Sequence, residues 1–262
     1  IGIGHHAAYG VRGGAIVDMD AAKSSILTAV NAAEEMAGEQ IRSAVVNLTA
    51  GSPTSRTFGV EVAVAGHEIG ETDLRRILGH GIAQDSDSDR ELIHCIPVGY
   101  SIDGSRGIRD PRGMFGHKLG VRMHLVSAGS GAYRNLMTCI AGCQLDIEEV
   151  VVSPFASGLA CLVEDEMDLG VTIVDMGGGA TTIAVFYDGH VVHADVVAIG
   201  GGHVTSDIAR GLSTPLADAE RMKTLYGGAI PSPEDEREVI DVPLVGEDKS
   251  AQPNHVPRSL LV

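Results

Sequence analysis

The chain has 262 residues, of which 44% are hydrophobic and 21% charged, so its composition is that of a globular protein rather than a disordered or fibrous one. Asp and Glu number 35 against 19 Lys and Arg, which gives a formal net charge of −16. A chain this acidic repels the backbones of nucleic acids and anionic lipid surfaces, so we expect no nucleic-acid partner.

No apolar run approaches the roughly 20 residues that a membrane-spanning helix needs. The first ten residues lack the basic and apolar regions of a signal peptide. The chain begins with Ile1 rather than methionine, so we expect it to be part of a longer protein. Its four cysteines lack the paired spacing of a metal site, and we expect reduced thiols.

The first half of the chain mixes helical and strand patterns. Apolar residues at helical spacing predict helices over 20–37 and 72–83. We expect Asp18 or Asp20 to cap the first helix and Gly38 to end it. Apolar or alternating runs predict strands over 44–50, 58–65, 91–101 and 119–126. Polar or turn-rich stretches predict loops over 51–57, 84–91 (QDSDSDRE) and 103–116.

After Gly131, predicted helices and strands alternate as in a βαβ arrangement. The helices are expected over 131–142, 154–166, 203–212 and 215–226. The strands are expected over 147–152, 170–175, 181–187 and 190–199. Asp188-Gly189 predicts a tight hairpin turn between the last two. The segment from Gly227 to Val262 is rich in proline and acidic residues, and we expect a loop or a partly ordered extension.

The most informative motif lies in VTIVDMGGGATTIAVF, residues 171–186, where Asp175 ends an apolar strand and three glycines follow. Glycines allow positive φ and close approach of a ligand to the backbone. Consecutive N–H groups in such a loop bind phosphates, and a carboxylate at the strand end can hold Mg²⁺ through water. A plain hairpin turn needs only two residues, so the motif favours a phosphate-binding loop over a structural turn.

Two weaker elements follow. Gly200, Gly201 and Gly202 precede a predicted helix, and glycines there suit close approach of a ribose or phosphate, although they also serve packing. Glu220 and Lys223 share one face of the next helix, where an exposed ion pair is the simpler interpretation.

Other nucleotide and hydrolase motifs are excluded. The segment from Gly2 to Ala7 matches a loose G-x-G-x-x-A pattern, but it lacks a complete preceding strand and a helix directly after it. The sequence has no G-x-x-x-x-G-K-[ST] loop and no G-x-S-x-G nucleophile turn.

In this order, D-x-G-G-G, I-G-G-G-H-x-T-x-D-I-A and A-E-x-x-K-x-x-Y-G resemble the motifs of the actin/Hsp70-type ATPase superfamily. Within it, the chain resembles the FtsA family of bacterial cell-division proteins through segments outside the nucleotide motifs. These include YGVRGG at 9–14, NLTAG at 47–51, DPRGM at 110–114 and VSPFASGLACLVE at 152–164.

The resemblance implies an α/β, actin-like ATPase (RNase H-like) fold with an inserted subdomain of the FtsA type, called 1C. The expected division is 1–52 with 126–167 as an incomplete subdomain 1A, 53–125 as 1C, and 168–262 as 2A with the start of 2B. The second phosphate-binding hairpin would be Asp175, with a metal role, followed by Gly177, Gly178, Gly179, Ala180 and Thr181. Gly201 and Gly202 would lie by the ribose and phosphates, and Glu220 and Lys223 by the adenosine. The implied cofactors are ATP and Mg²⁺.

The implied role is an adaptor that tethers the FtsZ ring to the inner membrane at the division septum. Its implied partners are FtsZ, further copies of itself in an actin-like filament, and later division proteins recruited through 1C. Family members reach the membrane through a C-terminal helix, which we expect to lie beyond this chain. The first phosphate hairpin and the second adenosine motif are likewise expected outside it, so the isolated chain is expected to bind ATP weakly or not at all.

The sequence departs from the pattern in ways that bear on hydrolysis. Residues 180 and 182 are Ala and Thr, where the family usually has Thr and Asp. Ser153 precedes Pro154 where Hsp70-type ATPases place the Glu that orients the attacking water. We therefore assign no catalytic residue and expect weak or absent ATP hydrolysis.

Two alternatives stay open. One is an active ATPase, chaperone or small-molecule kinase of the same fold, which steady ATP turnover would indicate. The other is a binding module without nucleotide, which failure of the full-length protein to bind ATP with Mg²⁺ would indicate.

Overall fold

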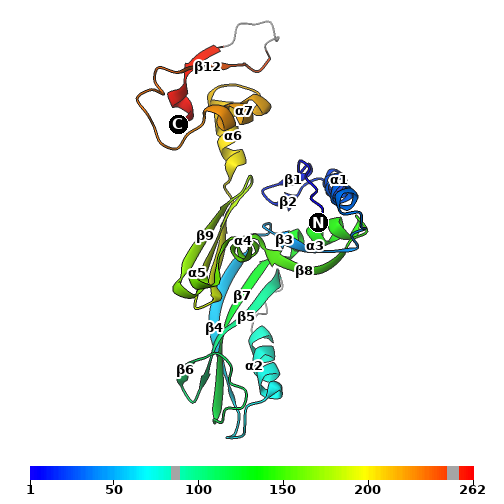
Figure 1. Ribbon diagram of the computed structural model, residues 1–262, viewed down its shortest axis with the longest axis vertical. Helices are drawn as coiled ribbons and strands as arrows, with labels where there is room; N and C mark the ends of the chain where they lie inside the picture. Colours follow the sequence, from blue (N-terminus) through cyan, green and yellow to red (C-terminus); the bar gives the residue numbers. More distant parts are fainter. Residues whose placement is uncertain (84–88, 247–253) are drawn as a thin grey trace. The chain divides into compact units, whose positions relative to one another are not determined.

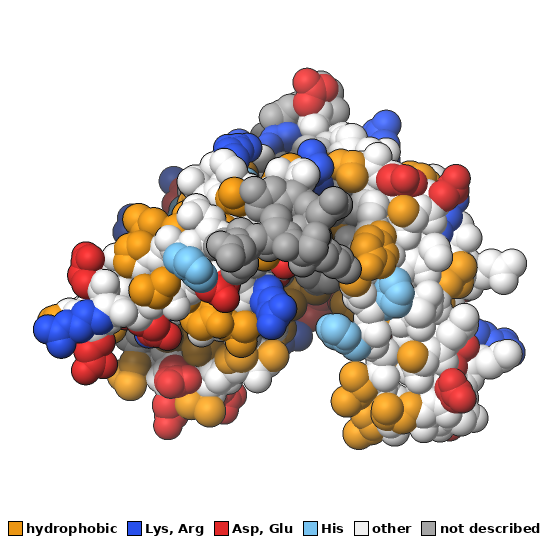
Figure 2. Space-filling model, turned by 90° about the horizontal axis from the view of Figure 1, so that it is seen from above, with side chains coloured by type: hydrophobic (Ala, Val, Ile, Leu, Met, Phe, Trp, Pro, Cys, Tyr) orange, Lys and Arg blue, Asp and Glu red, His pale blue; other side chains and the backbone are white. Residues whose placement is uncertain are grey.

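The computed structural model describes residues 1–83, 89–246 and 254–262, and they form two compact units (Figure 1). Unit 1 holds residues 1–176 and 180–198, and unit 2 holds residues 177–179 and 199–262. Among the described residues, no helix combines the length and apolarity needed to cross a bilayer. On the face drawn in Figure 2, acidic and basic side chains are interspersed rather than gathered into fields of one sign.

A parallel strand pair forms one part of unit 1. β3 (Ser43–Leu48) pairs with β8 (Asp146–Val152), and α1 (Met19–Ala37) and α3 (Ser130–Ala141) pack against the pair through Val30, Ile140 and Val46. As predicted, Asp18 caps α1, and Gly38 ends it with a φ of 72°. A short hairpin, β1 (Val11–Arg12) with β2 (Ala15–Ile16), precedes α1.

A four-stranded antiparallel sheet forms a second part of unit 1. Its strand order is β4-β7-β5-β6, with bounds Thr54–Ala63, Lys118–Gly129, Arg90–Ile102 and Ser105–Ile108 respectively. One face packs on α2 (Glu71–Ala83), where Ile77 meets Val121 and Met123 in the core. The expected loop at 51–57 is wrong from Thr54 on, because polar Thr54–Thr57 pair with β7 as strand. Residues 84–88 of the expected loop at 84–91 lie outside the described ranges.

A three-stranded antiparallel sheet completes unit 1, in the order β11 (His190–Val197), β10 (Thr181–Tyr187), β9 (Val171–Met176). Asp188 and Gly189, both with positive φ, form the predicted turn. The helix expected over 154–166 is instead two helices, α4 (Ser153–Cys161) and α5 (Glu164–Leu169). The residues between them are extended, so the helix breaks without glycine or proline. Phe186 packs against Gly158 of α4, where a Cβ would lie 2.3 Å from its ring.

Unit 2 contains α6 (Gly201–Gly211), α7 (Leu216–Tyr226) and more regular structure than predicted. The expectation of a loop after Gly227 is wrong: β12 (Val239–Val242) and β13 (Asn254–Pro257) form an antiparallel hairpin, followed by the 3₁₀-helix η1 (Arg258–Leu261). Their buried residues Ile240, Val242 and Leu261 pack against Met222 of α7. The core of unit 2 depends on this hairpin for its apolar contacts.

Candidate functional site

The glycine loop and the start of α6 lie in direct backbone contact within unit 2. The N–H of Gly201 donates to the carbonyl of Gly177 at 3.0 Å, and that of Gly202 to the carbonyl of Gly178 at 2.7 Å. A Cβ on Gly202 would lie 3.0 Å from the Gly178 oxygen, so only glycine allows this approach without a shift. None of Gly177, Gly178 and Gly179 has a positive φ, so the loop relies on the close backbone approach that glycine allows and not on its positive-φ conformations.

The other side of the loop is open. A Cβ added to Gly178 would meet no atom within 4 Å. The first N–H groups of α6 already have acceptors, because Gly201 and Gly202 donate to the loop and His203 donates to Gly200. A ligand can therefore approach the backbone at the start of this helix closely, but these first N–H groups are not free to donate to it.

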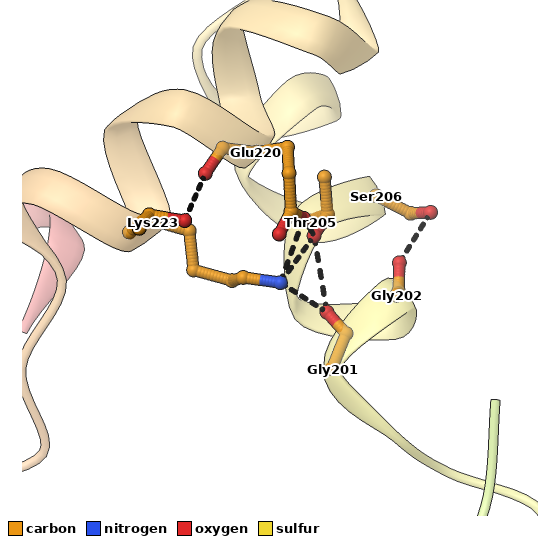
Figure 3. Close-up of polar contacts among 7 residues, drawn as sticks. Gly201, Gly202, Thr205, Ser206, Glu220 and Lys223 are labelled. Atoms are coloured by element: carbon orange, nitrogen blue, oxygen red, sulfur yellow. Dashed lines mark hydrogen bonds and ion pairs between the residues drawn. The ribbon is translucent and has the colours of Figure 1, made fainter. Parts of the chain in front are cut away.

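Lys223 and Glu220 meet Thr205 in a polar cluster between α6 and α7 (Figure 3). The ammonium group of Lys223 donates to the Gly201 carbonyl at 3.1 Å, to Thr205 Oγ1 at 2.9 Å and to Glu220 Oε2 at 2.7 Å. The hydrogen bond from Lys223, and then that from Thr205, holds the pKa of the Glu220 carboxyl below its usual value. The cluster joins the two helices and connects them to the backbone of Gly201.

The remaining predicted site residues belong to unit 1. Asp175 of β9 is half-buried, and its Oδ2 accepts a hydrogen bond from Ser157 of α4 at 2.8 Å. Ala180 is buried, and Thr181 opens β10 opposite Met176. Thr182 pairs with Asp175, is 2% exposed, and its hydroxyl finds no partner among the described residues.

A second polar cluster, outside the predicted binding residues, lies at the carboxyl ends of β3 and β8 and includes Ser153. Ser153 is buried, and its Oγ accepts from Asn47 Nδ2 at 2.9 Å and lies 2.6 Å from Thr49 Oγ1. The parallel register, in which Leu48 lies opposite Val152, brings these side chains together. Ligands of parallel sheets bind at this edge. The signal available in the sequence was a polar residue near the end of each strand: Asn47 and Thr49 at the end of β3, and Ser153 directly after β8.

A nucleotide and its metal ion require space for phosphates beside the backbone and at least one carboxylate near it. The open space beside Gly178 is a cradle that a side chain would fill, which fits a phosphate group. Within the described ranges, no three His, Cys, Asp or Glu side chains are grouped to hold a metal ion. One carboxylate still fits Mg²⁺, which keeps most of its waters and takes one or two protein ligands beside substrate phosphates.

Two family models match the chain. "Cell division protein FtsA" matches residues 172–261, and "SHS2 domain inserted in FTSA" matches residues 50–127, which contain the four-stranded sheet and α2. Along the sequence, one match lies before β8 and the other after it.

Curated proteins match over nearly the whole chain. Cell division protein FtsA of Rhizobium meliloti (strain 1021) is 49% identical over 261 residues, which are 100% of this chain and 59% of that protein. The protein of the same name from Bacillus subtilis (strain 168) is 34% identical and covered to 57%. The chain therefore spans somewhat more than half the length of the relatives it matches.

Among solved structures, a chain of a PilM-PilN type IV pilus biogenesis complex aligns with a TM-score of 0.59 at 17% identity. The alignment covers 84% of this chain and 60% of that one. At this identity the likeness concerns the fold alone. The predicted fold class, an actin-like ATPase fold with an inserted subdomain, is confirmed.

Proposed function

We propose that this chain, which belongs to the FtsA family of cell-division proteins, is the nucleotide-binding part of an actin-like division adaptor. The adaptor would bind ATP with Mg²⁺, assemble with further copies of itself, and hold FtsZ at the inner membrane of the division septum. Later division proteins would be recruited through residues 53–125. The subdomain boundaries given for 1A, 1C and 2A remain part of this proposal.

One observation carries the nucleotide proposal: the glycine loop touches α6 on one side and is open on the other. Gly177 and Gly178 accept from the first N–H groups of α6, while nothing lies within 4 Å of a Cβ on Gly178. In the proposal, the open side of the loop faces the phosphates. Gly201 and Gly202 allow the ribose to approach, and Lys223 and Glu220 flank the adenosine.

Asp175 would take part through its carboxylate, and bound Mg²⁺ would offset the negative charge of the phosphates. Ser157 orients that carboxylate by a hydrogen bond of 2.8 Å. Ser153 carries a hydroxyl, held by Asn47 and Thr49, where a water-positioning carboxylate would be needed for fast hydrolysis. We therefore expect ATP to act chiefly as a ligand that favours one conformation.

The test uses a chimera, because the chain spans 59% of its Rhizobium meliloti relative. This chain replaces the matching segment of that protein, and the product is photolabelled with an azido-ATP in the presence of Mg²⁺. We expect labelling that unmodified ATP displaces. Gly178→Val should reduce it strongly without unfolding the protein, because the new side chain enters open space.

The matched control is Gly211→Ala, which also adds a side chain into open space but at the far end of α6. It should leave labelling unchanged. Absence of any ATP-displaceable label in the folded chimera would overturn the nucleotide proposal.

The adaptor role needs a separate experiment. The chimera is sedimented with lipid vesicles and FtsZ, with and without ATP. We expect the vesicles to recruit FtsZ in an ATP-sensitive manner. No recruitment under either condition, with intact photolabelling, would remove the tethering role and leave nucleotide binding in place.

A further inference from the structure

A groove of about 800 Å³ lies on the four-stranded sheet of unit 1. Side chains alternate along β7, and Val121 and Met123 point to the core shared with α2. Gly120 and Arg122 therefore point to the opposite face, where the groove lies. The turn between β10 and β11, with Asp188 and His190, forms one wall. No residue of the glycine loop lines the groove.

On the floor of the groove, glycines without side chains flank one arginine. Arg122 lies on the central strand β7, and its register partners on the two flanking strands are Gly59 of β4 and Gly99 of β5. Gly120, the next residue along β7 on the same face, faces Ser101, whose Oγ would lie 2.3 Å from a Cβ. Arg122 thus lies between two glycines of the flanking strands, which leaves room for a ligand beside its side chain.

The charge of the groove is opposite to that of the chain. Arg106, Arg109 and Arg122 line it, against the carboxylates of Glu61 and Asp188. Arg106 and Arg122 are exposed and form no ion pair with any described residue. Arg109 reaches Asp188 only at 3.4 Å, with side chains 82% and 64% exposed, which is a weak pair. In a chain of net charge −16, this leaves unpaired guanidinium groups in one place.

A backbone edge runs along the same groove. β6 is the outermost strand of the sheet and pairs only with β5, so its other side has no strand partner among the described residues. Its residues Arg106, Gly107 and Ile108 line the groove. An extended peptide can bind such an edge through main-chain hydrogen bonds while its side chains enter neighbouring pockets. Guanidinium groups select carboxylates through paired hydrogen bonds.

We infer that this groove binds an extended acidic segment of a partner protein, which runs past β6 across the face of the sheet and places a carboxylate on Arg122. The inference rests on the proposal that residues 53–125 recruit partners, and it supplies the chemistry of one such partner. It does not depend on nucleotide.

The test measures fluorescence anisotropy of a labelled peptide of alternating Glu and Val with the whole chain, without ATP. The comparison peptides carry Gln or Lys in place of Glu. We expect saturable binding of the Glu peptide alone. Arg122→Glu should weaken it by about tenfold or more. Gly59→Val should weaken it similarly by filling the floor without changing the charge.

Gly59→Val is chosen because its Cβ would meet only the Val121 oxygen, at 3.9 Å, so the strand should fold as before. The charge-matched control is Arg75→Glu, an exposed residue of α2 on the other face of the sheet. It should leave the affinity unchanged. If it weakens binding as much as Arg122→Glu does, the attraction is non-specific and the inference fails.

Two further outcomes would overturn the inference. One is no saturation of binding below about 1 mM peptide. The other is full displacement of the peptide by inorganic phosphate that carries the same total negative charge, which would indicate a small-anion site. Either result would leave the ATP photolabelling of the chimera unaffected, so a failure here is distinguishable from a failure of the nucleotide proposal.

Discussion

The ammonium group of Lys223 and the carboxylate of Glu220 lie 2.7 Å apart on one face of α7, and both also contact the hydroxyl of Thr205 on α6. The Lys223 side chain is 25% exposed and that of Glu220 54%, so the ion pair alone contributes little. Thr205 is buried, and it makes the pair part of the packing between two helices. The adenosine-facing surface in our proposal is therefore held in shape by the hydroxyl of Thr205, the threonine of the I-G-G-G-H-x-T-x-D-I-A motif.

Thr205→Val should lower the free energy of unfolding by about 1–2 kcal/mol, because the shape is kept while Lys223 and Glu220 lose a buried partner. Urea denaturation measures the change. Thr224→Val is the control, since that hydroxyl only donates to the Glu220 carbonyl at an exposed site. Its effect should stay within about 0.5 kcal/mol. Equal losses in the two variants would contradict the role given to Thr205.

Gly202→Ala should destabilise the protein, although helix propensity alone would predict that alanine stabilises α6. Alanine normally stabilises a helix relative to glycine by roughly 0.5–1 kcal/mol, but here its Cβ would press on the Gly178 oxygen at 3.0 Å. We expect lower stability and weaker ATP labelling. Gly211→Ala, at the open end of the same helix, should instead be neutral or stabilising. Thermal melting of both variants measures whether the melting temperature falls for Gly202→Ala while it stays the same or rises for Gly211→Ala.

The elements that could be predicted from the sequence are those with local signals. Asp18 and Gly38 mark the ends of α1, and Asp188-Gly189 marks the turn between β10 and β11. β12 has no such signal, because it is only four residues long and its partner β13 is separated from it by the segment 243–253, PLVGEDKSAQP. The break between α4 and α5 was missed because Leu162 and Val163 are extended without glycine or proline nearby.

The candidate site was only partly predictable for a similar reason. The motif indicated that Gly178 and Gly202 belong together, and their 2.7 Å hydrogen bond agrees. It could not show that this bond occupies an N–H group at the start of α6. Nor could it join Asn47 to Ser153, which are 106 residues apart and meet only through the parallel register of β3 and β8.

Ser153→Ala should cost about 1–2 kcal/mol of stability, because Asn47 loses an acceptor and Thr49 a partner in a part-buried site. Ser206→Ala is a suitable control, since its hydroxyl donates to a carbonyl in an exposed part of α6. If nucleotide binds at this edge of the sheet, added ATP should stabilise the wild-type chimera and its Ser206 variant equally. A smaller ATP-induced shift in melting temperature for the Ser153 variant would place the hydroxyl beside the ligand.

The free energy of unfolding should fall as the pH decreases, because a buried histidine lies between the inserted sheet and β11. His124 is fully buried; its Nδ1 lies 3.2 Å from Thr57 Oγ1, and its Nε2 has no partner among the described residues. Burial first, and then the nearby His193 and His94, lower the pKa of His124 from 6.5 to about 4. Burial also lowers the pKa of His94.

A histidine whose pKa is lowered by folding takes up a proton more readily in the unfolded chain. The unfolded state therefore binds more protons between pH 6.5 and about 4, and the free energy of unfolding falls as pH decreases through that window. His124 alone accounts for a loss of at most about 3 kcal/mol, and none of it appears above pH 7. Denaturation at pH 7.5, 6 and 5 measures the slope.

His124→Leu should flatten that slope by up to one proton, because it places a side chain that does not titrate at the same buried position. His80→Gln, at an exposed position on α2, is the control for loss of a histidine. Carboxylates titrate in the same direction below about pH 5, so the difference between the two variants above that pH is the informative quantity. If both variants keep the wild-type slope, the pH dependence arises elsewhere in the chain and His124 is not its source.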